Sequence, residues 1–435
     1  MSGKSVSHAR SGIGLLLCLA FIIGITAPAG NLKAQDWKKS YITNLQRLDF
    51  RFLGYPDVNE IPVNSSAITS LLTAASGIVY GATTGDTAYL FLFEPGTNKV
   101  RHLGKVGDEQ AVHHALAEDS QGNIYLGTGL NPFSDLEFSG RHLGDKSIEE
   151  TIWKDVKAPF AGYEGGHLFR YNPAKSNERV KLPGMQSELE DLGIPLAGNS
   201  VYALTSSPDK QTLYGLTYPD GHFFAYDIAG GTFSDKGPVD SKLMFHGPER
   251  HWRSLPRALI CTKDGRVYTS GTDGYLVFYD PATDRIERTG YMLPGDRFPG
   301  EDATYAVAEY FTAGHDGKIY GGASDGHLFS FSTRGDPHLK NLGKARSARR
   351  LRCLTTGDDG RIYLIAGERT STRHCMMFAW DPRDPGYKEL GMVIVDNSPH
   401  YYWRGYQFDA MATGLDGTIY MGESERKSHL FLYIP

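Results

Sequence analysis

The sequence predicts an all-β protein, a seven-bladed β-propeller closed by a strand from its own N-terminal region. Three observations predict this fold. One short phrase recurs seven times along the chain, its apolar positions alternate between Gly, Asp, Pro and Asn turns, and each end of the chain holds part of a repeat. Short strands at regular spacing with turn signals are typical of four-stranded propeller blades.

The repeat is clearest at 264–281, DGRVYTSGTDGYLVFYDP, and each copy carries one shared tyrosine. These residues are Tyr80, Tyr125, Tyr214, Tyr268, Tyr320, Tyr363 and Tyr420. They are 43–57 residues apart except for one gap of 89, which indicates an insertion at about 128–164 in the second blade. An insertion of this length in one repeat is more often functional than decorative, and 145–160 within it is predicted to form a short helix.

The last repeat ends at Pro435 after three strands, and its fourth strand is expected near the N-terminus. The segment FRFLGYP at 50–56 copies VRHLGKV at 100–106, the end of the first repeat. Pairing this segment with the last blade would close the ring and remove two exposed sheet edges.

The first residues have the features of a secretory signal peptide over 1–34. Lys4 and Arg10 precede an apolar run at 13–25, and small residues lead to Ala34. The run is too short to span a membrane, and no later segment approaches about 20 apolar residues. We therefore expect residues 35–435 to form one propeller domain, secreted or periplasmic and monomeric. A net charge of −5 gives no reason to expect a nucleic-acid partner.

Aligning the repeats on the tyrosine places seven side chains at the start of the innermost strands, around one mouth of the central channel. They are Thr69, His114, Tyr202, Arg257, Glu309, Arg352 and Asp409. Polar residues can simply line a wet channel. The mixture of His, Tyr, Arg and carboxylates also suits proton transfer and anion binding.

Two further groups of residues belong to the same face. The turn before the third strand of each repeat ends in Tyr89, His167, His222, Tyr275, His327, Met376 and His429. A repeat-encoded packing role covers His327 and His429 better than His167 and His222. The loops entering the inner strands hold further candidates for binding an anionic sugar polymer: Arg253, Tyr402, Trp403 and Arg404.

Three cysteines follow the leader, so at least one is free or metal-bound. Cys261 with His222 and His246 is a possible site for one structural zinc ion, although the spacing matches no standard finger. Cys353 and Cys375 are either buried thiols or paired with each other. Nothing in the sequence indicates an organic cofactor.

The arrangement resembles the seven-bladed propeller polysaccharide lyases, particularly the secreted bacterial ulvan lyases. The shared features are the export signal, the propeller, and the trio His114, His167 and Tyr202. The resemblance implies β-elimination at a uronic acid. The resemblance implies that Tyr202 acts as base at C5 and also as acid at the leaving oxygen. It implies that His114 and His167 neutralise the carboxylate or share in proton transfer. Tyr218 stands where the family has an arginine, and Arg257 would substitute for it.

The sequence therefore predicts a secreted lyase for a uronate-containing, sulfated polysaccharide. His114, His167, Tyr202 and Arg257 are its predicted catalytic residues. Predicted to bind substrate are Tyr218, Arg253, Glu309, Arg352, Tyr402, Trp403, Arg404 and Asp409. The main alternative is a non-catalytic propeller that binds glycans or proteins. A metal-dependent hydrolase or lactonase ranks lower because the ring offers only two carboxylates, and a quinone-dependent dehydrogenase ranks lower still.

Overall fold

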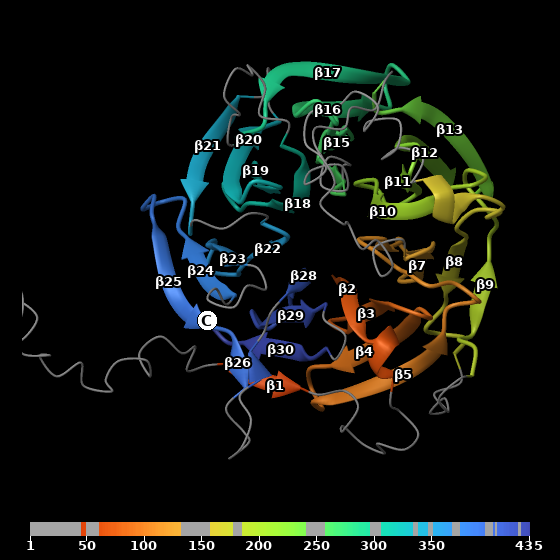
Figure 1. Cartoon of the computed structure of the whole chain (residues 1–435), viewed down its shortest axis with the longest axis horizontal. Coiled ribbons are helices and arrows are strands. Elements are labelled where there is room, and N and C mark those ends of the chain that lie inside the picture. The colour runs from red at the N-terminus through yellow and green to blue at the C-terminus, as the bar shows by residue number, and fades with distance from the viewer. Residues whose placement is uncertain are drawn as a thin grey trace, which may run out of the picture. The chain divides into compact units, whose positions relative to one another are not determined.

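Seven four-stranded antiparallel sheets surround a common centre within Ile42–Pro435 (Figure 1). This confirms the predicted seven-bladed β-propeller. The computed structural model describes residues 45–48, 61–131, 157–176, 185–240, 257–295, 306–333, 338–346, 351–367, 375–395, 403–404, 407–424 and 428–435. The predicted leader, 1–34, and the predicted closing segment, 50–56, lie outside these residues.

Each blade runs in chain order from an inner to an outer strand. Blade 1 is β2 (Ala67–Thr73), β3 (Val79–Thr84), β4 (Tyr89–Glu94) and β5 (Lys99–Lys105). Blade 2 is β6 (Leu116–Glu118), β7 (Ile124–Gly127), β8 (Leu168–Tyr171) and β9 (Leu189–Asp191). Blade 3 is β10 (Ser200–Ser206), β11 (Thr212–Tyr218), β12 (His222–Asp227) and β13 (Thr232–Pro238).

The remaining blades follow the same pattern. Blade 4 is β14 (Ile260–Cys261), β15 (Val267–Ser270), β16 (Tyr275–Asp280) and β17 (Arg285–Met292). Blade 5 is β18 (Ala308–Ala313), β19 (Lys318–Ala323), β20 (His327–Ser332) and β21 (Leu339–Lys344). Blade 6 is β22 (Cys353–Thr356), β23 (Ile362–Ala366), β24 (Met376–Trp380) and β25 (Tyr387–Met392).

Blade 7 contains β28 (Phe408–Thr413), β29 (Ile419–Glu423) and β30 (Leu430–Tyr433). Its fourth strand is β1 (Leu45–Leu48), which pairs antiparallel with β30 from Leu45↔Tyr433 to Leu48↔Leu430. A small extra pair joins β26 (Ile394–Val395) to β27 (Trp403–Arg404).

The blade 2 insertion lies in the connection between β7 and β8. Most of the predicted helix at 145–160 falls outside the described residues, and its end forms the 3-10 helix η3 (Ala158–Phe160). A second 3-10 helix, η2 (Val63–Ser65), precedes β2. Across the part of the chain that the structure describes, no helix is long and apolar enough to cross a membrane.

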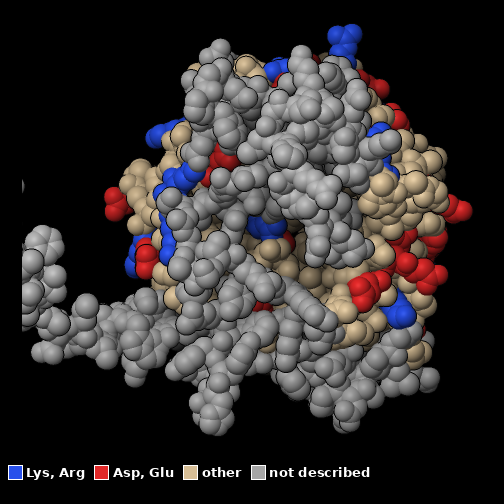
Figure 2. Space-filling view, in the orientation of Figure 1, with Lys and Arg blue, Asp and Glu red and all other residues tan. Residues whose placement is uncertain are grey.

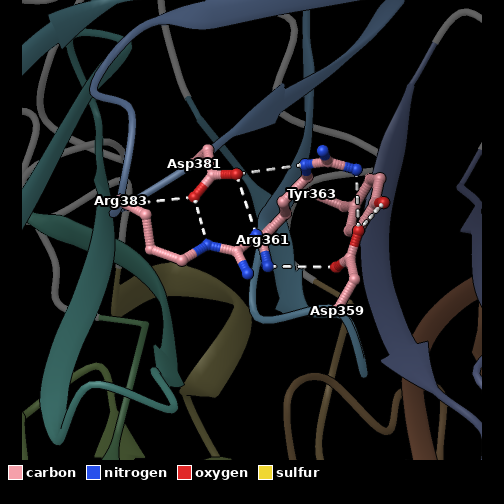
Figure 3. A network of polar contacts seen from close by, with 5 residues as sticks. All are labelled: Asp359, Arg361, Tyr363, Asp381 and Arg383. Atoms are coloured by element: carbon pink, nitrogen blue, oxygen red, sulfur yellow. Dashed lines mark hydrogen bonds and ion pairs between the residues drawn. The ribbon is translucent and has the colours of Figure 1, made fainter.

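The repeated phrase is explained by one turn that joins the first two strands of a blade. In blade 6 the Asp359 carboxylate accepts the backbone N–H of Arg361 at 3.0 Å and the Tyr363 hydroxyl at 2.8 Å (Figure 3). Gly360 between them has φ 78°, a conformation that favours glycine. All seven repeat tyrosines are buried, so this turn fixes a large ring between neighbouring blades.

A glycine follows the repeat tyrosine in three blades because a phenylalanine ring covers it. Gly81 lies under Phe91, and the same pairing recurs in blades 3 and 5. A Cβ on Gly321 would lie 2.3 Å from Cζ of Phe329, closer than real contacts allow. The glycine therefore makes room for a ring from the next strand.

Cys353 and Cys375 do not pair. Cys353 is on β22 opposite Ile365 of β23, and Cys375 directly precedes β24 on the other side of β23. Two strand spacings place their Cα atoms about 10 Å apart, beyond the roughly 7 Å that a disulfide spans. Both side chains are buried, and no disulfide joins them.

Candidate functional site

Seven residues at the mouth-side start of the innermost strands form what we call the channel ring: Thr69, His114, Tyr202, Arg257, Glu309, Arg352 and Asp409. In β2, β10, β18 and β28 the pairing register shifts at the ring residue, for example between Ala308 and Tyr310 around Glu309. A bulge of this kind leaves one residue unpaired and re-aims its side chain. In these four blades a β-bulge therefore turns the side chain of the channel-ring residue out of the sheet.

Charged members of the channel ring lie together in pairs from neighbouring blades. Nη1 of Arg352 is 3.0 Å from Oδ1 of Asp409, and Nη1 of Arg257 is 3.7 Å from Oε2 of Glu309. All four side chains are largely buried. Figure 2 shows Lys or Arg side chains at the base of a central hollow on this face. The mouth therefore holds buried positive and negative charge close together.

Asp409 stays ionised in this setting. Burial alone would raise the pKa of its carboxyl, but the Arg352 charge and the Ser424 hydroxyl outweigh burial and hold the pKa below its usual range. The hydroxyl donates to Oδ2 at 2.6 Å, and Gln407 donates to the same oxygen at 3.2 Å. Thr69, in contrast, is tied into the wall, where its Oγ1 lies 2.6 Å from Oγ1 of Thr84 and donates to the Val112 carbonyl at 2.7 Å.

His114 is a neutral imidazole at neutral pH. Burial lowers its pKa to about 4. Among the charged residues of the channel ring, Asp409 and Glu309 raise this pKa, and Arg257 and Arg352 lower it. Its ring meets the Tyr310 ring edge-on, with the centroids 5.4 Å apart. A neutral histidine beside fixed charges can accept a proton.

Tyr202 lies between two aromatic rings and near one cation. Its ring centroid is 4.3 Å from that of His113 and 5.2 Å from that of Tyr218, and Cζ of Arg257 is 5.9 Å away. Burial raises the pKa of the Tyr202 hydroxyl to about 12, although Arg257 works in the opposite direction. A tyrosine that acts as base needs a lowered pKa, whereas here desolvation of the phenolate outweighs the nearby cation and raises it.

His113 is a site residue that the repeat alignment missed. It is buried against Tyr202, its Nε2 lies 3.4 Å from the carbonyl oxygen of Leu130, and burial followed by the charge of His114 lowers its pKa to about 3. Only the adjacent pair His113–His114 in the sequence pointed to it. His113 is one position before the channel-ring residue His114, and it contacts Tyr202 because the backbone here departs from a regular strand.

His167 and Tyr218 have different surroundings. Tyr218 is buried and stacks on Tyr202, within the site. His167 is held by Asp191 of the outer strand β9, with Nδ1 2.9 Å from Oδ1, and stacks on Phe169. The structure therefore assembles His114, Tyr202 and Arg257 and anchors His167 on the outer side of its blade.

The same outer-strand anchoring occurs in the next blade. Nδ1 of His222 is 3.0 Å from Oδ1 of Asp235 on β13. Asp191 and Asp235 each also accept the N–H of the glycine two residues later. The histidine and the aspartate thus form one repeated motif. In it, His167 and His222 have a structural role, which is to join the third strand of the blade to the outer strand.

The proposed zinc group does not assemble from the residues that the structure places. Cys261 lies beside Thr205 near the β10–β11 turn, whereas His222 lies at the β11–β12 turn, at the other end of the same strands. Their separation is incompatible with one ion at bonds of about 2 Å. Burial raises the pKa of the Cys261 thiol to about 12. Within the described ranges no group of three metal-binding side chains occurs.

Several predicted binding residues cannot be placed. Arg253, His246 and Tyr402 lie outside the described residues. Trp403 and Arg404 form β27, of which the structure describes the backbone only. Their proposed contacts with substrate stay predictions.

Comparison with known proteins agrees with the fold. The sequence matches no protein-family model and no curated protein. A streptogramin B lyase is similar in structure, with TM-score 0.57 and 13% identity over 91% of this chain and 99% of that chain. The virginiamycin B lyase of Staphylococcus aureus has TM-score 0.55 at 10% identity, over 90% of this chain and 99% of that one. A fungal copper-bound alcohol oxidase has TM-score 0.54 at 14% identity, over 89% and 77%. Identities this low show the fold alone.

Proposed function

We propose that this protein is an exported polysaccharide lyase that cleaves an anionic, uronate-containing polymer by β-elimination at the channel ring. The observation that carries the proposal is the cluster of a neutral His114, a protonated Tyr202 and the Arg257 guanidinium at one mouth. Two propellers of similar fold are named lyases, which is compatible with this reaction class.

The protonation states assign the roles. Arg257 pairs with the substrate carboxylate and so makes the C5 proton more acidic. Neutral His114 removes this proton. The electron pair of the broken C5–H bond forms the C4=C5 double bond, and the C4–O bond breaks. Tyr202 gives its hydroxyl proton to the leaving oxygen. Transfer of the proton from His114 to the Tyr202 phenolate through solvent restores the starting state. Tyr202 therefore acts only as acid in this proposal, and His114 takes the role of base at C5 that the resemblance gave to Tyr202.

The polymer class follows from the charges and the exported sequence features. Arg257 and Arg352 offer planar guanidinium groups, which suit carboxylate and sulfate. We therefore propose a sulfated, uronate-rich polymer such as ulvan as the substrate class. His167 and the structural zinc ion have no role in this proposed mechanism.

The test is far-ultraviolet absorbance during incubation of the mature protein with ulvan and other uronate polymers. Elimination creates a conjugated double bond, which hydrolysis does not. Tyr202→Phe should reduce the rate by about 100-fold or more, the usual contribution of a positioned proton donor. Tyr214→Phe, a buried tyrosine elsewhere in blade 3, should keep the wild-type rate.

A second candidate, a propeller that binds glycans without cleaving them, has one observation in its favour. Arg352 and Asp409 satisfy each other within the ring, with Ser424 and Gln407 completing the carboxylate. Binding of a uronate polymer with no absorbance change on any substrate, and unchanged binding by Tyr202→Phe, would replace the lyase proposal with this one.

A further inference from the structure

Tyr310 is the one large side chain at a position where every other blade has a small one. The residue directly after each member of the channel ring is Ser70, Ala115, Ala203, Ala258, Tyr310, Cys353 or Ala410. The six small side chains are buried, and five of them belong to the hydrophobic cores of the blades. Tyr310, in contrast, is only partly buried and packs against the edge of such a core.

The contacts of Tyr310 place it over the axis. It belongs to β18 of blade 5, its hydroxyl donates to the Met411 carbonyl of blade 7 at 3.0 Å, and its ring meets the edge of His114 in blade 2. Going round the seven blades, these three are separated by three, two and two steps (Figure 1). The axis therefore lies inside the triangle that they form, and a side chain reaching all three lies across the centre.

Below Tyr310 the inner strands present hydroxyl groups. Oγ1 of Thr312 is 3.1 Å from Oγ1 of Thr356, and Oγ1 of Thr355 is 2.9 Å from Oγ1 of Thr413. These residues join blades 5, 6 and 7. A channel with such polar walls would admit water up to the ring if nothing closed it.

We propose that Tyr310 is the floor of the site: it closes the central channel beneath the channel ring, makes the mouth a blind pit, and orients and dehydrates His114. A substrate then enters and leaves by the same mouth, so the polymer lies across it or ends in it and does not thread through the propeller. The role of Tyr310 as a positioning residue for catalysis rests on the proposed function. Its role as floor does not.

The groups that face His114 from the surrounding elements are unchanged by substitution of Tyr310. They are His113, Arg257, Glu309, Arg352 and Asp409. What changes is the apolar surface against the imidazole, which now keeps water away. Burial is the main cause of the low pKa of His114, so an opened floor should move that pKa toward its ordinary value.

The experiment is an NMR titration of His114 in the full-length mature protein with labelled histidine, assigned with His114→Gln. Wild type and Tyr310→Phe, which keeps the ring, should titrate near pH 4. Tyr310→Ala should titrate higher by at least about one unit. Tyr291→Ala removes a tyrosine in edge-on contact with His338 on the outer surface, and should leave the titration of His114 unchanged.

Tyr310→Leu keeps a large apolar side chain at this position. If Tyr310→Ala does not fold, the titration of His114 in Tyr310→Leu is compared with that in a smaller variant. A low pKa in Tyr310→Leu together with a raised pKa in a smaller folded variant, Tyr310→Val, supports the floor. An unchanged titration in either small variant overturns it. A shifted titration in a protein with no lyase activity would retain the floor and reject the proposed function. Wild-type elimination with an unchanged titration would do the reverse.

Discussion

Mild acidification should destabilise the propeller through His113 and His114. The folded protein holds the pKa of His113 at about 3 and that of His114 at about 4, against an ordinary value of 6.5. The unfolded chain therefore binds these protons at a higher pH than the folded one. The free energy of unfolding is then greatest above pH 6.5 and falls as the pH drops toward the folded values.

The size of the effect follows from these values. Between pH 7 and pH 5 each histidine lowers the free energy of unfolding by about 2 kcal/mol, and the two together by about 4 kcal/mol. At about 2 cal/mol/K of unfolding entropy per residue, a domain of this size should lose about 5 °C in Tm. The result at pH 5 is insensitive to the exact folded pKa values, since both groups are still neutral in the folded state.

Calorimetry and urea unfolding at the two pH values measure this loss. His114→Asn should remove about half of the pH dependence, whereas His315→Asn, on an exposed turn, should remove little. If the wild type and His114→Asn lost the same stability between pH 7 and pH 5, His114 would not be held neutral by burial, and its assignment as base would fail with it.

Two further predictions concern the scaffold. Arg352→Met should lower the free energy of unfolding by about 3 kcal/mol, because it leaves the Asp409 carboxylate buried without its cation; in denaturant melts, adding Asp409→Asn should recover most of this, and no recovery would contradict the ion-pair account. Gly321→Ala should destabilise by about 1–3 kcal/mol through the clash with Phe329, whereas Gly290→Ala, with open space at its Cβ, should stay within about 0.5 kcal/mol. Equal melting temperatures for these two glycine variants would contradict the packing role of Gly321.

The candidate site was predictable from the sequence only where the repeat carries it. A position eleven residues before the shared tyrosine is set by strand length, and so His114, Arg257, Glu309, Arg352 and Asp409 were found by alignment. His113 and Tyr310 were missed because they are neighbours of ring residues, and a regular strand would point them away from the centre. The bulge at Glu309 changes the direction of the Tyr310 side chain, and the residue pattern does not predict this bulge.

The sequence by itself determined the number of blades, their order and the turn chemistry, because a repeat encodes its turn contacts over a few residues, as Asp359, Gly360 and Tyr363 do in blade 6. Only the tertiary structure decided which residues of different blades and strands lie close together. It separated His222 from Cys261, kept Cys353 and Cys375 apart, and placed Tyr310 against blades 2 and 7. It also raised the pKa of Tyr202, since the pKa of a phenol depends on how completely its surroundings exclude water, and that exclusion is a property of the packed ring.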